Sequence, residues 1–589
     1  MLNKESLHNQ LITRRAFVLG ASGTGMLSLL AMRMFYMQAI KSDDYRILSD
    51  QNRISPIMIH PLRGNIFDCK NRLIAGNRRS FCLILDKNEN KNYKTSLDFL
   101  FEILSLTESQ KNLIHKKIAK QGLKTPLNIM DDISWEQLTI VEENIAKLPG
   151  IYVEIKEVRE YKYDETLAHI VGYTGILNEK EKRELGINNV GNFLLGKNGL
   201  EKYYESTLRG NFGVKKMEVN ASGSYVRELS TKESEQGSNL LINIDAQLQE
   251  SIYKMLPSTG ASAIVMDINN GKILSAASSP SFNPNNFCGG ISQDYWKKLN
   301  DSPYNPLLNR ISQGTYPPGS VFKLITVLAA LIEGIDPSMI VNCTGGASAL
   351  GNNHYRCWHT AGHGKLDMKA AIEHSCNSYM YKIVKMIGGE RILSLARKLG
   401  FGTATGIDLP SESSGFVPHE EWKKRRYKTE WTLGDSLNIS IGQGALLVTT
   451  AQLARLATII ASKGKLCTPK IVGTSKIVDL GIDERHFEFL QSAMYDVVNR
   501  EGGTAYSKRV LDPAWLMAGK TGTSQVQAKR GQTDLNNVSF AGRNHALFLG
   551  FAPANKPLYS VVVVVDHGGG GGSAAAPIAR DIVIELSKI

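Results

Sequence analysis

The sequence lacks the long apolar runs and basic stripes that mark several common protein classes. Beyond about residue 40 there is no second apolar run of 18 residues, which excludes a multi-span membrane protein. No arginine-rich helix and no basic stripe interleaved with aromatic residues occurs, which argues against nucleic-acid binding despite a net charge of +13. Charged residues make up only 21% and hydrophobic residues 42%, so the chain is globular rather than disordered. Its positive charge suits an anionic lipid surface or an anionic polymer.

One apolar stretch stands at the N-terminus. Residues 16–32 are uncharged, Arg14 and Arg15 precede them, and Arg33 is followed by the apolar run MFYMQAI. If Arg33 extends its charged end to the interface, the whole segment has about the length of one membrane-spanning helix.

The basic residues in front of this stretch predict its orientation. The positive-inside rule gives a cytoplasmic tail at 1–15, a transmembrane anchor at 16–39 and an extracytoplasmic position for the rest of the chain. The alternative is a cleaved signal peptide, since residues 13–17 resemble a twin-arginine export signal. A retained anchor is favoured, because no small-x-small cleavage site is followed by a polar start.

The length of 589 residues predicts two or three domains, because single cores rarely grow beyond about 300 residues. Residues 40–235 mix helical and strand-like periods, which predicts a smaller α/β domain. The polar tract 228–239 has the composition of an exposed connector. From 236 to 589, strand patterns enclose a helix-rich block, which predicts an α+β domain with an antiparallel sheet flanked by helices. The GGGGGS run at 568–573 predicts a loop before a closing helix.

Ser320 and Lys323 stand three residues apart at the start of the apolar helical pattern VFKLITVLAALI, after the turn-forming Tyr316-Pro317-Pro318-Gly319. Positions three apart share one helix face, so the lysine amine can lie against the serine hydroxyl. A serine is a weak nucleophile until a base takes its proton, and a lysine can be that base only if its pKa is lowered. By itself this pattern also fits an ordinary capped helix start.

Two further short motifs follow in order. Ser375-Cys376-Asn377 stands about 55 residues later and offers a hydroxyl that can relay a proton and an amide that can hold a peptide bond. Lys520-Thr521-Gly522-Thr523 lies in a strand-like context, where the glycine allows close approach of a substrate backbone. Lys520 and Thr523 can bind a carboxylate, and the Thr523 N–H can stabilise an oxyanion. The three motifs together are typical of serine acyl-transferases of the penicilloyl class.

These motifs resemble those of the class B penicillin-binding proteins, and other segments extend the resemblance over nearly the whole chain. Residues 63–68, RGNIFD, resemble the start of that family's pedestal domain, and Gly199-Leu200-Glu201 resembles a later motif of it. Residues 355–358, YRCW, with Gly362-His363-Gly364, and the tail from His567 resemble the elongation-specific penicillin-binding protein 2 group.

The resemblance implies a β-lactamase-like penicilloyl-serine transferase domain at 236–589, preceded by a pedestal or dimerisation domain at 40–235 and one transmembrane helix. It implies a peptidoglycan D,D-transpeptidase that acts in cell elongation. Ser320 would be acylated by the D-Ala-D-Ala end of a stem peptide, the acyl group would pass to a neighbouring peptide amine, and β-lactams would acylate the same serine. The catalytic residues implied are Ser320, Lys323, Ser375, Asn377 and Lys520, and the substrate-binding residues are Thr521, Gly522 and Thr523.

The family also implies partners and a location. The expected partner is a multi-span glycosyltransferase of the shape, elongation, division and sporulation (SEDS) type within an elongation complex. The chain would lie in the cytoplasmic (inner) membrane as a single-pass protein, with its catalytic domain in the periplasm. No organic cofactor is implied.

Three other functions share features with this one. A serine β-lactamase or β-lactam sensor has the same three motifs, but the N-terminal module of about 200 residues and the retained anchor disfavour it. A catalytically idle scaffold that activates a glycosyltransferase is disfavoured by the intact catalytic set. A D,D-carboxypeptidase differs only in using water as the acyl acceptor.

The seven cysteines are unevenly distributed. Cys343, Cys357 and Cys376 fall within 34 residues, with several histidines among them. Thiolates and imidazole together can form a tetrahedral zinc site, and the resemblance implies one structural zinc bound by Cys343, Cys357, His363 and Cys376. A Cys343–Cys357 disulfide and free buried thiols are the alternatives. The other four cysteines fit no cluster and are predicted to be free core residues.

Overall fold

The computed structural model describes residues 3–41, 54–87, 92–120, 126–184, 193–219, 225–288, 290–346, 348–350, 353–526 and 539–588. The chain forms two compact units. The first consists of Met1–Leu62 and Gly210–Gln236, and the second of Arg63–Arg209 and Gly237–Ile589.

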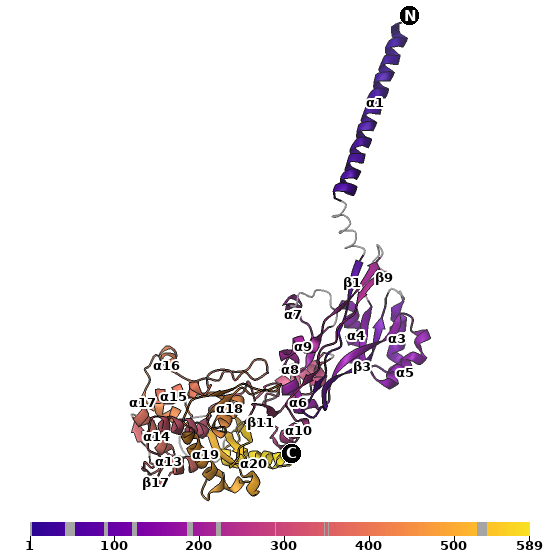
Figure 1. The fold of residues 1–589 in the computed structure, drawn as a ribbon. Coiled ribbons are helices and arrows are strands. Elements are labelled where there is room, and N and C mark those ends of the chain that lie inside the picture. Colours follow the sequence, from indigo (N-terminus) through magenta and orange to yellow (C-terminus); the bar gives the residue numbers. More distant parts are fainter. Residues whose placement is uncertain are drawn as a thin grey trace. The chain divides into compact units, whose positions relative to one another are not determined.

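The first unit contains the N-terminal helix α1 (Asn3–Phe35), which continues as a π-helical turn to Ile40 (Figure 1). The segment Arg14–Ile40 is long and apolar enough to cross a membrane, and none of it is buried within the protein. Large apolar side chains such as Phe17, which is 76% exposed, have no protein core to pack against. By length and composition this helix therefore suits the predicted anchor.

A three-stranded antiparallel sheet completes the first unit, in the order β1 (Ile54–Ile59), β8 (Gly213–Val219) and β9 (Tyr225–Lys232). The prediction that 228–239 is an irregular connector was wrong for its first part, because residues 228–232 pair with β8. Their polar composition reflects full exposure rather than the absence of a strand. Cross-strand ion pairs such as Lys215–Glu228 fit an exposed strand.

The second unit begins with a mixed sheet around the long strand β3 (Leu73–Leu85), which pairs with β4 (Leu127–Ile133) and β5 (Ile151–Tyr161). Apolar residues of these strands pack with α3 (Tyr93–Ile103) and α5 (Trp135–Glu143) in a core of their own. The sheet continues through β2 (Ile66–Phe67) to β10 (Leu240–Leu241), which pairs with β2 in parallel. One sheet thus contains strands from both sides of the predicted boundary at 235.

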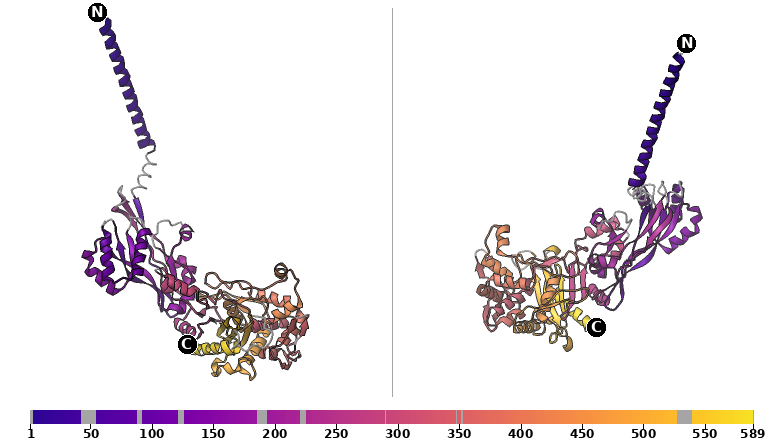
Figure 2. Two further views of the ribbon diagram at one scale, coloured as in Figure 1. Left: turned by 180° about the vertical axis from the view of Figure 1, so that it is seen from behind. Right: turned by 45° about the horizontal axis from the view of Figure 1, so that its top comes forward.

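The larger part of the second unit is built on a five-stranded antiparallel sheet. Its order is β12 (Ile273–Ser279), β11 (Ala261–Asp267), β23 (Tyr559–Val565), β22 (His545–Ala552) and β21 (Ala518–Ser524). The sheet therefore joins strands near residue 270 with strands from the end of the chain, drawn in yellow in Figure 2. This arrangement agrees with the antiparallel sheet predicted from the sequence.

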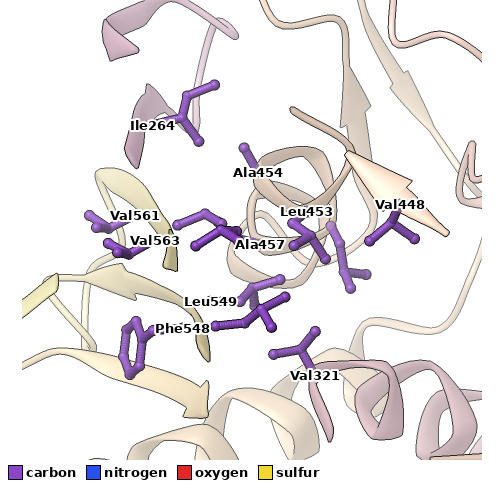
Figure 3. Packing of buried hydrophobic residues seen from close by; sticks show 14 of the residues in the cluster. Ile264, Val321, Val448, Leu453, Ala454, Ala457, Phe548, Leu549, Val561 and Val563 are labelled. Atoms are coloured by element: carbon purple, nitrogen blue, oxygen red, sulfur yellow. The ribbon is translucent and has the colours of Figure 1, made fainter. Parts of the chain in front are cut away.

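Helices cover this sheet and position the motifs. Helix α18 (Thr450–Ala461) packs on one face, while α10 (Ala246–Met255) and α20 (Ala576–Leu586) contact its strands and each other. Every residue of α18 is buried, as expected for a helix that is apolar nearly all round. Figure 3 shows Leu549 of β22 between Ala457 of α18 and Val321. This core holds the start of α12 (Lys323–Ile332) against the sheet.

Candidate active site

Ser320 lies in a short 3₁₀ turn, Gly319–Phe322, that leads directly into α12. Gly319 has φ +54°, and its N–H donates to the Gly442 carbonyl oxygen at 2.9 Å. A Cβ at Gly319 would come within 2.6 Å of the Thr523 carbonyl oxygen, so only glycine permits this approach. The turn therefore holds the half-buried Ser320 beside β21, the strand that carries the third motif.

Lys323 is fully buried and connects the first two motifs. Its Nζ donates to the Ser375 carbonyl oxygen at 2.6 Å, to Asn377 Oδ1 at 2.7 Å and to Ser375 Oγ at 3.1 Å. Burial lowers its pKa from 10.5 to about 8, although nearby Cys357 and Cys376 act in the opposite direction. Roughly a tenth of this lysine can therefore be neutral at pH 7, the form that a proton acceptor needs.

Lys520 in β21 is also fully buried, and its Nζ donates to the Thr521 carbonyl oxygen at 3.1 Å. Burial and the nearby charge of Lys323 lower its pKa well below the usual value. Two lysines with lowered pKa values thus come from different elements to one place. Such a pair is typical of sites that move protons.

The second motif follows the C-terminus of α13 (Met368–Glu373). Ser375 has φ +55°, a left-handed conformation unusual for a residue other than glycine. Both ends of the Asn377 amide are engaged, since Oδ1 accepts from Lys323 and Nδ2 donates to the Arg356 carbonyl oxygen at 3.1 Å. The second N–H of Nδ2 remains as a donor for a further acceptor.

Several residues outside the three motifs contact them. The Gly571 N–H donates to Thr523 Oγ1 at 3.3 Å, so the glycine-rich tail packs directly on β21. A Cβ at Gly571 would lie 2.3 Å from the Gly522 carbonyl oxygen. Thr504 shares a 2.7 Å hydrogen bond with Thr521, and Gln443 Nε2 donates to the Thr523 carbonyl oxygen at 3.4 Å. Two of these contacts had a signal in the sequence, the polyglycine run for Gly571 and the Ser440-Ile441-Gly442-Gln443-Gly444 segment, which resembles one in the family, for Gln443, and Thr504 had none.

The predicted metal ligands come together beside the second motif. Cys343, Cys357, His363 and Cys376 place their ligand atoms within 4.8 Å of one another. His363 Nδ1 lies 3.5 Å from both the Cys343 and the Cys357 sulfur, and the Cys357 and Cys376 sulfurs are 4.0 Å apart. A tetrahedral zinc with ordinary bond lengths has edges of about 3.5 to 3.8 Å between such ligands, so the residues fit this ion.

The pKa values of two thiols in this cluster shift in opposite directions: the hydrogen bond with Cys357 and burial raise that of Cys376, so a metal ion would have to displace its proton. Hydrogen bonds from the Cys376 thiol and from backbone N–H groups lower the pKa of Cys357, which favours the thiolate that binds metals. All seven cysteines are free thiols in the structure, but the prediction that the four outside the cluster are core residues was wrong for Cys69, which is exposed. The 4.0 Å between Cys357 and Cys376 is about twice a disulfide bond length.

Comparison with known families assigns both parts of the chain. The model of the penicillin-binding protein transpeptidase domain matches residues 261–583, and that of the penicillin-binding protein dimerisation domain matches residues 58–242. Fold and site together thus define a serine acyl-transferase of the penicillin-binding class. The predicted fold class is confirmed.

Individual relatives narrow the assignment. The peptidoglycan D,D-transpeptidase MrdA of Acinetobacter baumannii is 35% identical over 557 residues, which cover 90% of this chain and 81% of that protein. MrdA of Escherichia coli K12 is 31% identical over 94% of this chain and 90% of its own. The structure of penicillin-binding protein 2 with MreC from Helicobacter pylori matches with a TM-score of 0.80 and 29% identity, over 91% of this chain and 99% of that one. The chain belongs to the penicillin-binding protein 2 family.

Proposed function

We propose that this chain cross-links peptidoglycan through an acyl-enzyme on Ser320. As a peptidoglycan D,D-transpeptidase, it takes the D-Ala-D-Ala end of a stem peptide as its acyl donor. The observation that carries the assignment of residues is the buried Lys323 amine, which is held by Ser375 and Asn377 at the end of the turn that presents Ser320. Ser320, Lys323, Ser375, Asn377 and Lys520 are the proposed catalytic residues.

In the proposed acylation, neutral Lys323 takes the Ser320 proton as Oγ attacks the carbonyl carbon of the penultimate D-Ala. Backbone N–H groups of Ser320 and Thr523 stabilise the oxyanion. The C–N bond then breaks, and the terminal D-Ala leaves as an amine after receiving a proton through Ser375. Lys520, Thr521 and Thr523 hold its carboxylate, while Gly522 leaves room for its backbone. An amine of a neighbouring peptide then attacks the ester and frees Ser320.

The chain is a membrane-anchored penicillin-binding protein. We propose that the anchor lies in the cytoplasmic membrane, with a tail at 1–15, the anchor at 16–39, the pedestal at 40–235 and the transpeptidase domain at 236–589 in the periplasm. The dimerisation-domain model matches residues 58–242 and the transpeptidase-domain model matches residues 261–583, which supports a domain boundary close to the proposed one. Related structures include the complex with MreC and a peptidoglycan synthase complex. By analogy, the proposed partners are a SEDS-type glycosyltransferase of the elongation complex and a protein similar to MreC.

Joint reconstitution tests the reaction and the partner. The full chain and its cognate glycosyltransferase, placed together in liposomes with lipid-linked precursor, are expected to yield cross-linked muropeptide dimers. Digestion followed by liquid chromatography and mass spectrometry measures them. Penicillin should remove the dimers and leave polymerised glycan. Shortened monomeric peptides without dimers would identify a D,D-carboxypeptidase, and polymer formation that requires this chain without any peptide product would identify an idle scaffold.

We propose that Cys343, Cys357, His363 and Cys376 bind one structural zinc. Cys376 precedes α14 (Asn377–Ile387) and stands between Ser375 and Asn377. A zinc ion bound there would fix the backbone of the second motif. Its contribution is structural, because four protein ligands leave no open position for a reacting group.

Metal analysis of a matched pair of cysteine variants tests this site. The wild-type chain is expected to contain one zinc by mass spectrometry of the elements. Cys343→Ala should lose the zinc, and its melting temperature should fall by roughly 10 °C, because a structural zinc contributes several kcal/mol. Cys467→Ala removes an equally buried thiol outside the cluster and should keep the metal. A metal-free wild-type chain whose Cys343 and Cys357 resist alkylation until reduced would instead establish the disulfide.

A further inference from the structure

The C-terminus of α13 ends in a turn that needs external support. The Ser375 N–H donates to the Ile372 carbonyl oxygen at 3.1 Å, and the Cys376 N–H donates to that of Ala371 at 2.9 Å. This is a Schellman motif with Ser375 at the left-handed position, where glycine is usual. The conformation is unfavourable for serine, so surrounding contacts must hold it.

Trp358 supplies such a contact from a distant segment. Its indole Nε1 lies 3.1 Å from the carbonyl oxygens of both His374 and Ser375 and donates to them. The His374 carbonyl belongs to the group at a helix C-terminus that has no partner within the helix, and the Ser375 carbonyl lies one residue beyond it. The Ser375 oxygen is also the one that accepts from Lys323 Nζ at 2.6 Å. One carbonyl thus joins the indole to the proposed base.

Core packing does not explain a tryptophan at this position. The Trp358 residue is 56% exposed, and its ring meets His359 and His363 in edge contacts, with centroids 5.7 and 5.4 Å apart. A residue chosen for its apolar area would be expected to be buried. The indole N–H, by contrast, is directed at two backbone carbonyl oxygens.

We propose that Trp358 is a positioning residue whose indole N–H holds the Ser375 backbone, and through it Lys323, in the geometry for acylation. The indole keeps the Ser375 carbonyl directed towards the Lys323 amine while the strained turn keeps the Ser375 hydroxyl beside it. The proposal rests on the roles proposed above for Ser375 and Lys323. Trp358 itself touches no reacting atom.

An isosteric replacement of Trp358 separates the effect of its N–H group from the effect of its ring. Incorporating 3-benzothienylalanine at position 358 of the full chain puts sulfur where the N–H stands and keeps the ring shape. Acylation by a fluorescent penicillin is followed by stopped flow, which separates the acylation step from initial binding. The rate constant of the acylation step should fall about tenfold, the effect of one hydrogen bond, with the initial binding constant unchanged. Trp358→Phe should match it, and Trp296→Phe, which alters another exposed tryptophan, should behave as wild type.

Further measurements distinguish a positioning role of Trp358 from a general effect on the fold. Zinc content should stay unchanged in the isosteric variant, because the proposed metal ligands are preserved, and its melting temperature should fall only slightly, because two carbonyls lose one shared donor. If penicillin acylates that variant at the wild-type rate, the proposal is overturned. Weaker initial binding with a normal acylation step would also overturn it and would make the ring a ligand-binding surface. If Lys323→Met acylates normally, the assumed role of Lys323 has failed; if only the isosteric variant is normal, the role of Trp358 alone has failed.

Discussion

Replacing Ser320 by alanine is expected to abolish acylation by penicillin, with a loss on the order of 10⁶ in rate, as for the removal of other serine nucleophiles. Ser320 is half-buried on a turn that Gly319 and Gly442 position through their backbones, so the fold should be retained. Intact-mass spectrometry of the full chain after exposure to penicillin measures the effect. The wild-type chain should carry one long-lived penicilloyl adduct, and the variant should carry none.

The matched control is Ser338→Ala, which removes an exposed hydroxyl bound to Asp336 and should be acylated normally. An adduct on the Ser320→Ala chain would assign the nucleophile elsewhere. A wild-type adduct that disappears quickly, with release of hydrolysed drug, would indicate a β-lactamase.

Replacing Lys323 by methionine is expected to slow acylation by a factor of roughly 10³ to 10⁴, the upper range for removal of a general base. Methionine fills much of the lysine volume, whereas Lys323→Ala would add a cavity to the lost hydrogen bonds. Ser375 and Asn377 would still lose a donor, so a modest fall in melting temperature should accompany the lost rate. Stopped-flow acylation and thermal unfolding measure the two effects separately. Near-normal acylation would make Lys520, the other buried lysine of lowered pKa, the better candidate for the base.

The pH dependence of acylation follows from the same residue. Lys323 accepts a proton only when neutral, and its pKa is about 8 in the folded protein. The rate should therefore rise almost tenfold for each pH unit below that value and level off above it. Acylation measured from pH 6 to 9.5 checks this, and a rate that falls as the pH rises through 8 would contradict the assignment.

The sequence allowed the relative position of site residues to be predicted where they are only a few positions apart. Ser320 and Lys323 are three residues apart, and any helical turn brings them to one side. Even so, Ser320 lies in a 3₁₀ turn rather than in the first turn of α12. The turn depends on the approach of Gly319 to Gly442 and Thr523, which are distant in sequence.

Contacts between distant segments account for what could not be predicted. Residues 228–232 form a strand only because β8 pairs with them, and their polar composition gave no indication of it. The spacings among Cys343, Cys357, His363 and Cys376 are irregular, so the family resemblance, and not the spacing, indicated that their ligand atoms come within 4.8 Å of one another. The indole hydrogen bonds of Trp358 similarly join a segment before α13 to its far end.

The short parallel pairing of β2 with β10 affects how this protein can change during evolution. Leu240 and Leu241 follow the predicted boundary but complete a sheet whose other strands precede it. The neighbouring Arg72 forms ion pairs with Asp68 on its own side and with Asp245 on the other. The two domains are therefore poor modules for exchange by recombination. A chimera with a foreign pedestal would inherit mismatched strand and charge partners, so the two domains are expected to diverge together as one heritable unit.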